Sequence, residues 1–225
     1  MRVLFRKDGK PYSQKFIHKC VQGVGGGCRP AIEKAISNSR HGINAKIFAE
    51  NAARLLPVMR LTQRGPFRGV KFAKGAVLDP ENRIARCWEL IGEDVCRIRR
   101  LLDHASNDRS RVVGLLEPAF CDEIAGFLWV LFKRLLPICM TPNTMGMPAA
   151  SKILFCGLPE AAISIEEQQW RELYQTVDYH DVIKAMVAEI GQWEAGTGLH
   201  LNRCDASVHA TLPSVYGIMA MRSCS

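Results

Sequence analysis

The sequence predicts a mainly α-helical globular protein, and three observations support this fold class. Apolar residues recur every three or four positions in several segments, helix-start and helix-stop residues bound those segments, and the β-prone runs are short. Hydrophobic residues make up 48% of the 225 residues, which is enough to form a buried core. We therefore expect a helical globular domain that contains a hairpin-like helix pair, with a basic, partly irregular N-terminal region.

Positive charge is concentrated in the N-terminal third of the chain. Residues 1–75 contain 16 lysines and arginines against 3 acidic residues, whereas residues 76–225 contain 14 against 19. This contrast divides the chain into a basic N-terminal region, 1–75, and a helical domain, 76–225. Such a basic region is typical of proteins that bind polyanions, most commonly nucleic acid. The alternative is a basic arm that contacts an acidic partner protein, and composition leaves both interpretations open.

The composition also bears on the compartment and on bound groups. Residues 1–10 lack the apolar stretch of a signal peptide, and the most apolar segment, 124–132, is far shorter than the roughly 20 residues that cross a membrane. Nine cysteines without a C-x-x-C pair indicate reduced thiols. We expect a cytoplasmic protein with no membrane contact, no cofactor and no metal. The alternative to a metal-free protein is an irregular zinc site formed by His18, Cys20, Cys28 and His41.

The first sixty residues predict mixed structure. Residues 2–6 are β-prone, a turn follows at 8–11, and 15–21 would be the return strand of a small hairpin. The glycine-rich residues 23–27 precede a helix at 31–36, and they are either a phosphate-binding turn or a linker. Apolar spacing predicts another helix at 43–56.

Residues 62–79 predict a loop or a short hairpin with nucleic-acid-binding character. Four basic residues alternate there with two phenylalanines: Arg64, Phe67, Arg68, Lys71, Phe72 and Lys74. Basic side chains interleaved with aromatic rings suit contact with a nucleic-acid backbone and exposed bases. The alternative is a surface loop that is pinned by two buried phenylalanines.

Helices dominate the remaining chain. Asp79 and Pro80 predict a helix start, and an apolar stripe continues to Leu102. Residues 118–136 form the most hydrophobic helix, which we expect to be buried nearly all round and to lie at the centre of the fold. A further helix is expected at 178–195, and the tail 199–225 predicts a loop with a short helix.

Residues 143–171 carry a family resemblance. Met145, Gly146 and Ala150 occupy the positions of the V-G-x-x-x-A segment, so this stretch resembles the second half of the hairpin in helix-hairpin-helix DNA glycosylases. Glu166 falls where that family has its catalytic aspartate. The stretch is also similar to uncharacterised bacterial proteins with an S-K-x-L…P…D-type segment.

The resemblance implies that a helix start binds a DNA phosphate through backbone N–H groups. The residues implied in this contact are Gly146, Ala149, Ser151 and Lys152. Pro148 stands where some family members have a nucleophilic lysine, and Glu166 replaces the aspartate. We therefore expect DNA binding without ordinary glycosylase catalysis. A degenerate glycosylase-like enzyme that uses Glu166 as its catalytic residue is the alternative.

A second group of acid–base candidates lies at the start of the helix expected at 178–195. His180 lies between Asp178 and Asp181, so it is either a general base or half of a metal site. The alternative is that the two aspartates cap the helix start.

Overall fold

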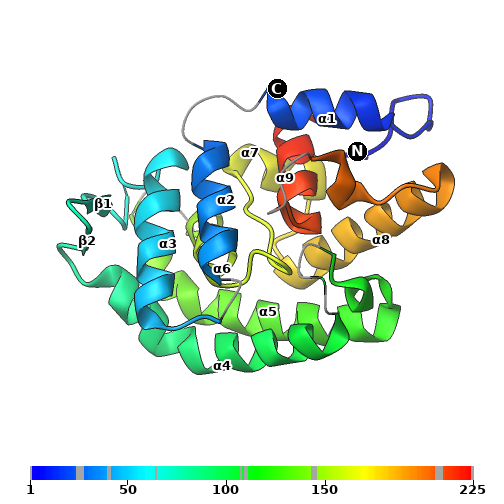
Figure 1. The fold of residues 1–225 in the computed structure, drawn as a ribbon. Helices are drawn as coiled ribbons and strands as arrows, with labels where there is room; N and C mark the ends of the chain where they lie inside the picture. Colours follow the sequence, from blue (N-terminus) through cyan, green and yellow to red (C-terminus); the bar gives the residue numbers. More distant parts are fainter. Residues whose placement is uncertain are drawn as a thin grey trace.

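The structure is a computed structural model that describes residues 2–23, 28–39, 42–63, 65–106, 108, 111–142, 146–205 and 210–223. Helices account for most of these residues, and the sheet that they contain is a single two-stranded hairpin (Figure 1). The predicted mainly α fold class is therefore confirmed.

The N-terminal segment differs from the predicted small hairpin. Phe5 and Pro11 form one antiparallel bridge, but residues 15–21 belong to helix α1 (Gln14–Gln22) and not to a return strand. Ser13 caps this helix by accepting a hydrogen bond from the backbone N–H of Phe16. The helix buries Ile17, Cys20 and Val21, whose spacing of three and four residues is helical.

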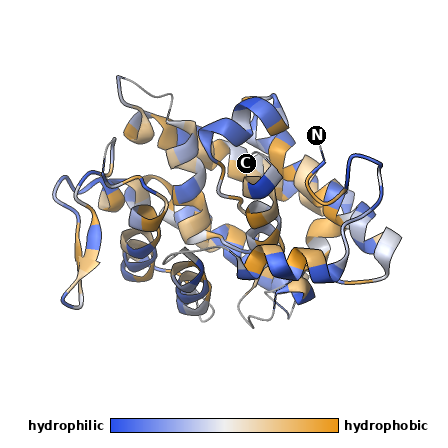
Figure 2. Cartoon of the chain, turned by 90° about the horizontal axis from the view of Figure 1, so that it is seen from above, coloured by the Kyte–Doolittle hydropathy of each residue, from blue (hydrophilic) through white to orange (hydrophobic). Residues whose placement is uncertain are grey.

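Helices α2 (Cys28–Ser39) and α3 (Ala45–Val58) pack side by side and confirm the two helices expected there. The hairpin follows as β1 (Lys71–Ala73) and β2 (Ala76–Leu78), and it contacts α3. Lys74 and Gly75 both have positive φ, +51° and +77°, as a two-residue type I′ turn requires. The hairpin projects from one end of the molecule in both views (Figures 1 and 2).

Two long helices, α4 (Arg83–Ala105) and α5 (Pro118–Cys139), run side by side along one edge (Figure 1). The short 3-10 helix η1 (Val113–Leu116) connects them. Helix α4 begins at Arg83 with Asn82 at its N-cap position, three residues later than the start that Asp79 and Pro80 predicted. The Asp79 carboxylate nevertheless accepts hydrogen bonds from the first N–H groups of the helix, those of Arg83 and Ile84.

The centre of the fold is α6 (Met147–Gly157), not the helix at 118–136. Every residue of α6 from Ala149 to Gly157 is buried, whereas α5 exposes Val130 and its charged neighbours. Hydrophobicity alone favoured α5, which packs against α4, α6 and α8 but keeps one side in solvent, whereas α6 is buried along nearly its whole length.

The chain ends with a short helix α7 (Glu167–Gln169), a π-helical turn η2 (Trp170–Tyr174), and helix α8 (Tyr179–Thr197). A 3-10 helix η3 (Leu201–Cys204) and α9 (Leu212–Ser223) follow. One continuous core contains buried side chains from Val3 to Ala220, so the change of charge near residue 75 is a property of the surface and not a break in packing.

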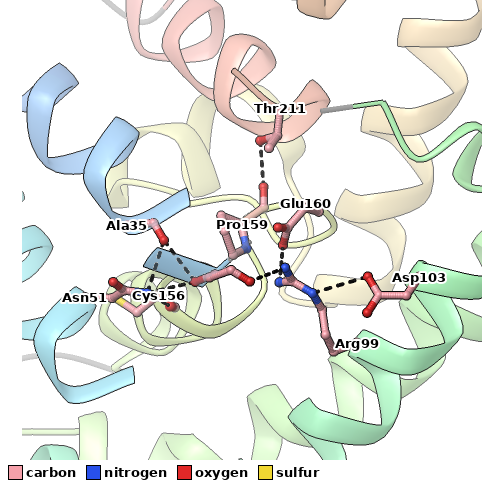
Figure 3. A network of polar contacts seen from close by, with 9 residues as sticks. Ala35, Asn51, Arg99, Asp103, Cys156, Pro159, Glu160 and Thr211 are labelled. Atoms are coloured by element: carbon pink, nitrogen blue, oxygen red, sulfur yellow. Dashed lines mark hydrogen bonds and ion pairs between the residues drawn. The ribbon is translucent and has the colours of Figure 1, made fainter. Parts of the chain in front are cut away.

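A buried polar network connects several of these helices near the C-terminal end of α6 (Figure 3). Arg99 of α4 pairs with Glu160 at 2.9 Å, and its guanidinium also donates to the Ser39 carbonyl of α2. The Asn51 amide of α3 donates to the Cys156 carbonyl at 3.1 Å. The Thr211 hydroxyl donates to the Pro159 carbonyl at 2.7 Å, which anchors α9. The end of α6 and the turn after it are thereby held by α3, α4 and the residue that precedes α9, and Arg99 links them to α2.

Candidate functional site

Lys152 and Glu166 form an ion pair between α6 and the start of α7. The Lys152 ammonium lies 2.7 Å from Oε1 of Glu166 and donates to the Met59 carbonyl at 3.2 Å. The Lys152 side chain is 1% exposed, whereas that of Glu166 is 45% exposed. Glu166 also caps α7, and Gln169 completes the capping box. The carboxylate is therefore fixed on one side and open to solvent on the other.

Two hydroxyl groups hold the extended segment that leads to Glu166. The Ile165 N–H donates to the Ser151 hydroxyl at 3.0 Å. The Tyr179 hydroxyl donates to the Ile163 carbonyl at 2.7 Å and accepts from the Ile163 N–H at 2.9 Å. The Tyr179 ring stacks on Phe132, with 4.8 Å between ring centroids. This arrangement positions Glu166 without using its own side chain.

Alkaline pH tests the role of Tyr179. Burial raises the pKa of this hydroxyl far above its usual value of 10. Above pH 10 the tyrosine ionises in the unfolded protein but stays protonated in the folded protein. Its contribution to the free energy of unfolding is therefore complete below pH 10 and is lost as pH rises, at up to about 1.4 kcal/mol per pH unit. We expect Tyr179→Phe to flatten the decline in unfolding free energy between pH 9.5 and 11, measured by urea denaturation. An equally steep decline in Tyr179→Phe and in the unaltered protein would contradict the burial of the Tyr179 hydroxyl.

Glu166 lines a small apolar hollow of about 80 Å³ that is open to solvent. The walls come from α2, the end of α3, α6 and α9, and are formed by Ile32, Val58, Met59, Phe155, Ser164, Pro213, Ser214, Gly217, Ile218 and Met221. Most of this lining is hydrophobic, and Glu166 is its charged member. The hollow therefore suits a mainly apolar group that donates a hydrogen bond.

The ion pair predicts that removing the Glu166 carboxylate lowers the free energy of unfolding more than removing the Lys152 ammonium. Glu166→Ala leaves the buried Lys152 ammonium with the Met59 carbonyl as its one acceptor among the described residues, which costs about 2–4 kcal/mol. Lys152→Met leaves the Glu166 carboxylate solvated, so we expect a loss nearer 1 kcal/mol. Urea denaturation of both variants gives the comparison. A larger loss for Lys152→Met would show that packing of the lysine stem outweighs the charge.

A second recess, which we call the basic groove, lies between the α2–α3 pair and the hairpin. It is lined by Pro30, Ala31, Lys34, Ala53, Arg54, Pro57, Val58, Lys71 and Phe72. The guanidinium carbon of Arg54 lies 3.7 Å from the centroid of the Phe72 ring. Val58 lines both the basic groove and the apolar hollow, so the two recesses are neighbours.

The structure gives the sequence-predicted residues two kinds of environment. Ala149, Ser151 and Lys152 are at most 3% exposed, so a nucleic acid has no access to their side chains in this conformation. Gly146 is also buried and adopts φ +76° at the start of α6. The carboxylate of Glu166 is accessible to a ligand in the hollow.

The predicted basic residues near the hairpin are accessible. Arg68, Lys71 and Lys74 are exposed, and Lys71 lines the basic groove. Phe72 also lines the groove, whereas Phe67 is fully buried, as the pinned-loop alternative expects for that ring. Arg64 lies outside the described residues.

Sequence reasoning missed Lys34 and Arg54. Lys34 precedes the hairpin by more than thirty residues, and its place in the groove follows from the packing of α2 on α3. Glu50 stands four residues before Arg54, a spacing that usually gives a helical ion pair. In the described part of the chain Arg54 pairs with no carboxylate and stacks on Phe72 instead.

The remaining candidates have structural partners. Asp178 caps α8, and His180 lies 3.2 Å from Asp122, which also pairs with Lys184. No group of three His, Cys, Asp or Glu side chains among the described residues is arranged to hold a metal. His41 and residues 24–27, which belong to the alternative zinc site and the glycine-rich turn, lie outside the described residues.

Comparisons with known proteins return no similar protein. No protein-family model, no curated protein and no solved structure matches this chain. Within the described residues, no helix has both the length and the apolar character that a membrane crossing requires.

Proposed function

We propose that this protein binds DNA in the cytoplasm, through contacts of the basic groove and the adjoining hairpin region with the phosphate backbone. The observation that carries the proposal is a set of cations without acidic partners. In the described part of the chain, no ion pair involves the following side chains: Lys34, Arg54, Arg68, Lys71 and Lys74. By contrast, the basic residue Arg29 in the same region pairs with both Glu33 and Asp205.

Clustered cations without counter-charges repel one another, and a polyanion relieves that repulsion. Each phosphate contact also releases condensed counterions from DNA, so binding of this kind is strong at low salt and weak at high salt. Arg54 adds geometric preference, because a guanidinium matches the two oxygens of a phosphate. The partly exposed Phe72 ring beside these cations favours DNA over an acidic partner protein as the polyanion, because exposed bases stack on aromatic rings.

Salt dependence tests the proposal on the full-length chain. With about four phosphate contacts, we expect the affinity for a fluorescein-labelled duplex to fall about 150-fold between 50 and 200 mM NaCl, measured by fluorescence anisotropy. The variant Lys34→Gln, Lys71→Gln, Lys74→Asn should lower the slope of log K against log salt by about 2.7. Asparagine is chosen at position 74 because it accepts the positive φ of the turn.

The matched control removes the same charge elsewhere. Lys7, Lys10 and Lys15 are exposed and belong to the N-terminal segment and α1, away from the hairpin end of the molecule (Figure 1). Their replacement by glutamine should leave the salt slope nearly unchanged. Absence of DNA binding at 50 mM salt would refute the proposal and favour an acidic partner protein. Equal effects of the two triple variants would refute the assignment to the groove and the adjoining hairpin.

A second candidate function, a degenerate glycosylase-like enzyme, is favoured by one observation. The half-exposed Glu166 carboxylate lines the hollow next to the basic groove, where an extruded base would meet it. The test is incubation with duplexes that carry modified bases, followed by alkaline cleavage of abasic sites. Glu166→Gln should retain DNA binding and lose base release. No release from any duplex by the unaltered protein would leave binding as the function.

A further inference from the structure

The basic groove places an aromatic ring among its cations, and the ring is held at a fixed orientation. Phe72 lies on β1, directly opposite Val77 of β2, and is partly exposed. The Arg54 guanidinium covers one side of the ring at 3.7 Å from its centroid. Pro30 and Pro57 add rigid apolar surface to the same groove. Flat and rigid apolar groups next to cations are the features that proteins use to stack exposed bases.

Arg54 is held in this place by the ring and not by an acid. Its Nε–H is buried and has no hydrogen-bond acceptor among the described residues. Glu50 stands one helical turn earlier on α3 but forms no ion pair with it in the described part of the chain. A guanidinium that is oriented by stacking and keeps its charge unpaired is prepared to bind a phosphate while the ring beneath it contacts a base.

The shape of the site distinguishes an unpaired strand from a duplex. Proteins read duplex DNA with a helix or a two-stranded ribbon that protrudes into a groove of the DNA. The projecting hairpin is a ribbon of this kind, but its aromatic residue Phe72 lines the recess between the hairpin and the α2–α3 pair. Here the cations Lys34, Arg54 and Lys71 line a recess of the protein, together with Phe72. The faces of bases in a duplex are covered by their neighbours, so an aromatic ring in a recess finds a stacking partner in an unpaired base.

We infer that the basic groove binds a single-stranded segment of DNA, with one base stacked on Phe72 and its flanking phosphates on Arg54, Lys34 and Lys71. The inference rests on the proposed DNA binding and names the form of DNA that the groove selects. Duplex DNA is the competing ligand, and it would contact the exposed lysines without using the ring.

The test compares a labelled 20-nucleotide oligo(dT) with a 20-base-pair duplex, both at 50 mM NaCl, for the full-length protein and three variants. Phe72→Leu keeps an apolar side chain and removes the aromatic face, and Phe72→Trp restores a face. Phe16→Leu is the matched control, because Phe16 is 40% exposed on α1, outside the groove. Thermal unfolding confirms that each variant is folded.

We expect the oligo(dT) to bind at least tenfold more tightly than the duplex. Phe72→Leu should weaken oligo(dT) binding about tenfold, whereas Phe72→Trp and Phe16→Leu should retain it. Equal affinity for the two ligands, or an unchanged affinity in Phe72→Leu, would overturn the inference while leaving DNA binding intact. Failure of both ligands to bind at 50 mM salt would instead refute the proposed function itself.

Discussion

Replacing Glu160 with alanine is expected to lower the free energy of unfolding by about 3–5 kcal/mol. Glu160 is 2% exposed and Arg99 is 3% exposed, so their ion pair is shielded from water. Without the Glu160 carboxylate, the buried guanidinium loses its fully buried acidic partner and keeps its hydrogen bond to the Ser39 carbonyl and the more distant Asp103 carboxylate. Desolvation of an insufficiently compensated charge is one of the largest penalties that a single substitution produces.

Urea denaturation measures this loss, and two further variants separate charge from packing. Asp103→Ala removes a half-exposed carboxylate 3.7 Å from Arg99, and it should cost less than 1 kcal/mol. The double variant Arg99→Met, Glu160→Leu replaces the pair by apolar groups and should recover most of the stability. A double variant as unstable as Glu160→Ala would show that the network acts through the hydrogen bonds of Arg99 to α2 and not through charge compensation.

The same network explains how the candidate site is supported. Glu160 follows α6 by three residues, and the extended segment from Ala161 leads directly to Glu166. Arg99 fixes the beginning of this connection and Lys152 fixes its end. Since Thr211 anchors α9 to the same turn, the walls of the apolar hollow depend on one buried framework (Figure 3). Loss of Glu160 should therefore disturb the hollow before it disturbs the hairpin.

Local sequence signals predicted the elements that are determined by contacts between residues close in the sequence. The apolar stripe from Ile84 to Leu102 faces the core as expected, and the Asp79 carboxylate accepts hydrogen bonds at the start of that helix. The hairpin at 71–78 also lies within the segment expected to form a loop or hairpin. Residues 15–21 were wrongly predicted as a strand, because in so short a segment apolar spacing is ambiguous and the Ser13 cap was the deciding signal.

Features that depend on distant partners could not be predicted. Lys152 is buried because Met59 and Glu166, 93 and 14 residues away, meet its ammonium. A sequence pattern places a lysine at the surface unless such partners are known. Arg54 illustrates the opposite case, because local spacing favours a pair with Glu50 while the hairpin supplies Phe72. The groove and the hollow form only through tertiary packing, so the sequence did not predict them. The basic residues of the hairpin were predicted, because local composition was enough to identify them.

Replacing Gly146 with alanine is the second substitution with a large expected effect. Gly146 adopts φ +76°, and a Cβ atom there would lie 2.7 Å from the carbonyl carbon of Cys139 and from the backbone nitrogen of Met140. The left-handed conformation costs alanine about 1 kcal/mol, and the collision with backbone atoms adds about 1–3 kcal/mol. We expect urea denaturation to show a total loss of about 2–4 kcal/mol with an unchanged m-value.

Gly198 supplies the matched control, because it has a similar backbone conformation to Gly146 but has open space where a Cβ atom would lie. It adopts φ +68° at the end of α8, and a Cβ atom there would meet no heavy atom of the structure within 4 Å. Gly198→Ala should therefore cost about 1 kcal/mol, the conformational part alone. Equal losses in the two variants would mean that the end of α5 yields to the added methyl group. A greater loss at Gly146 would establish that glycine is required there by the close approach of α5, independently of any contact with DNA.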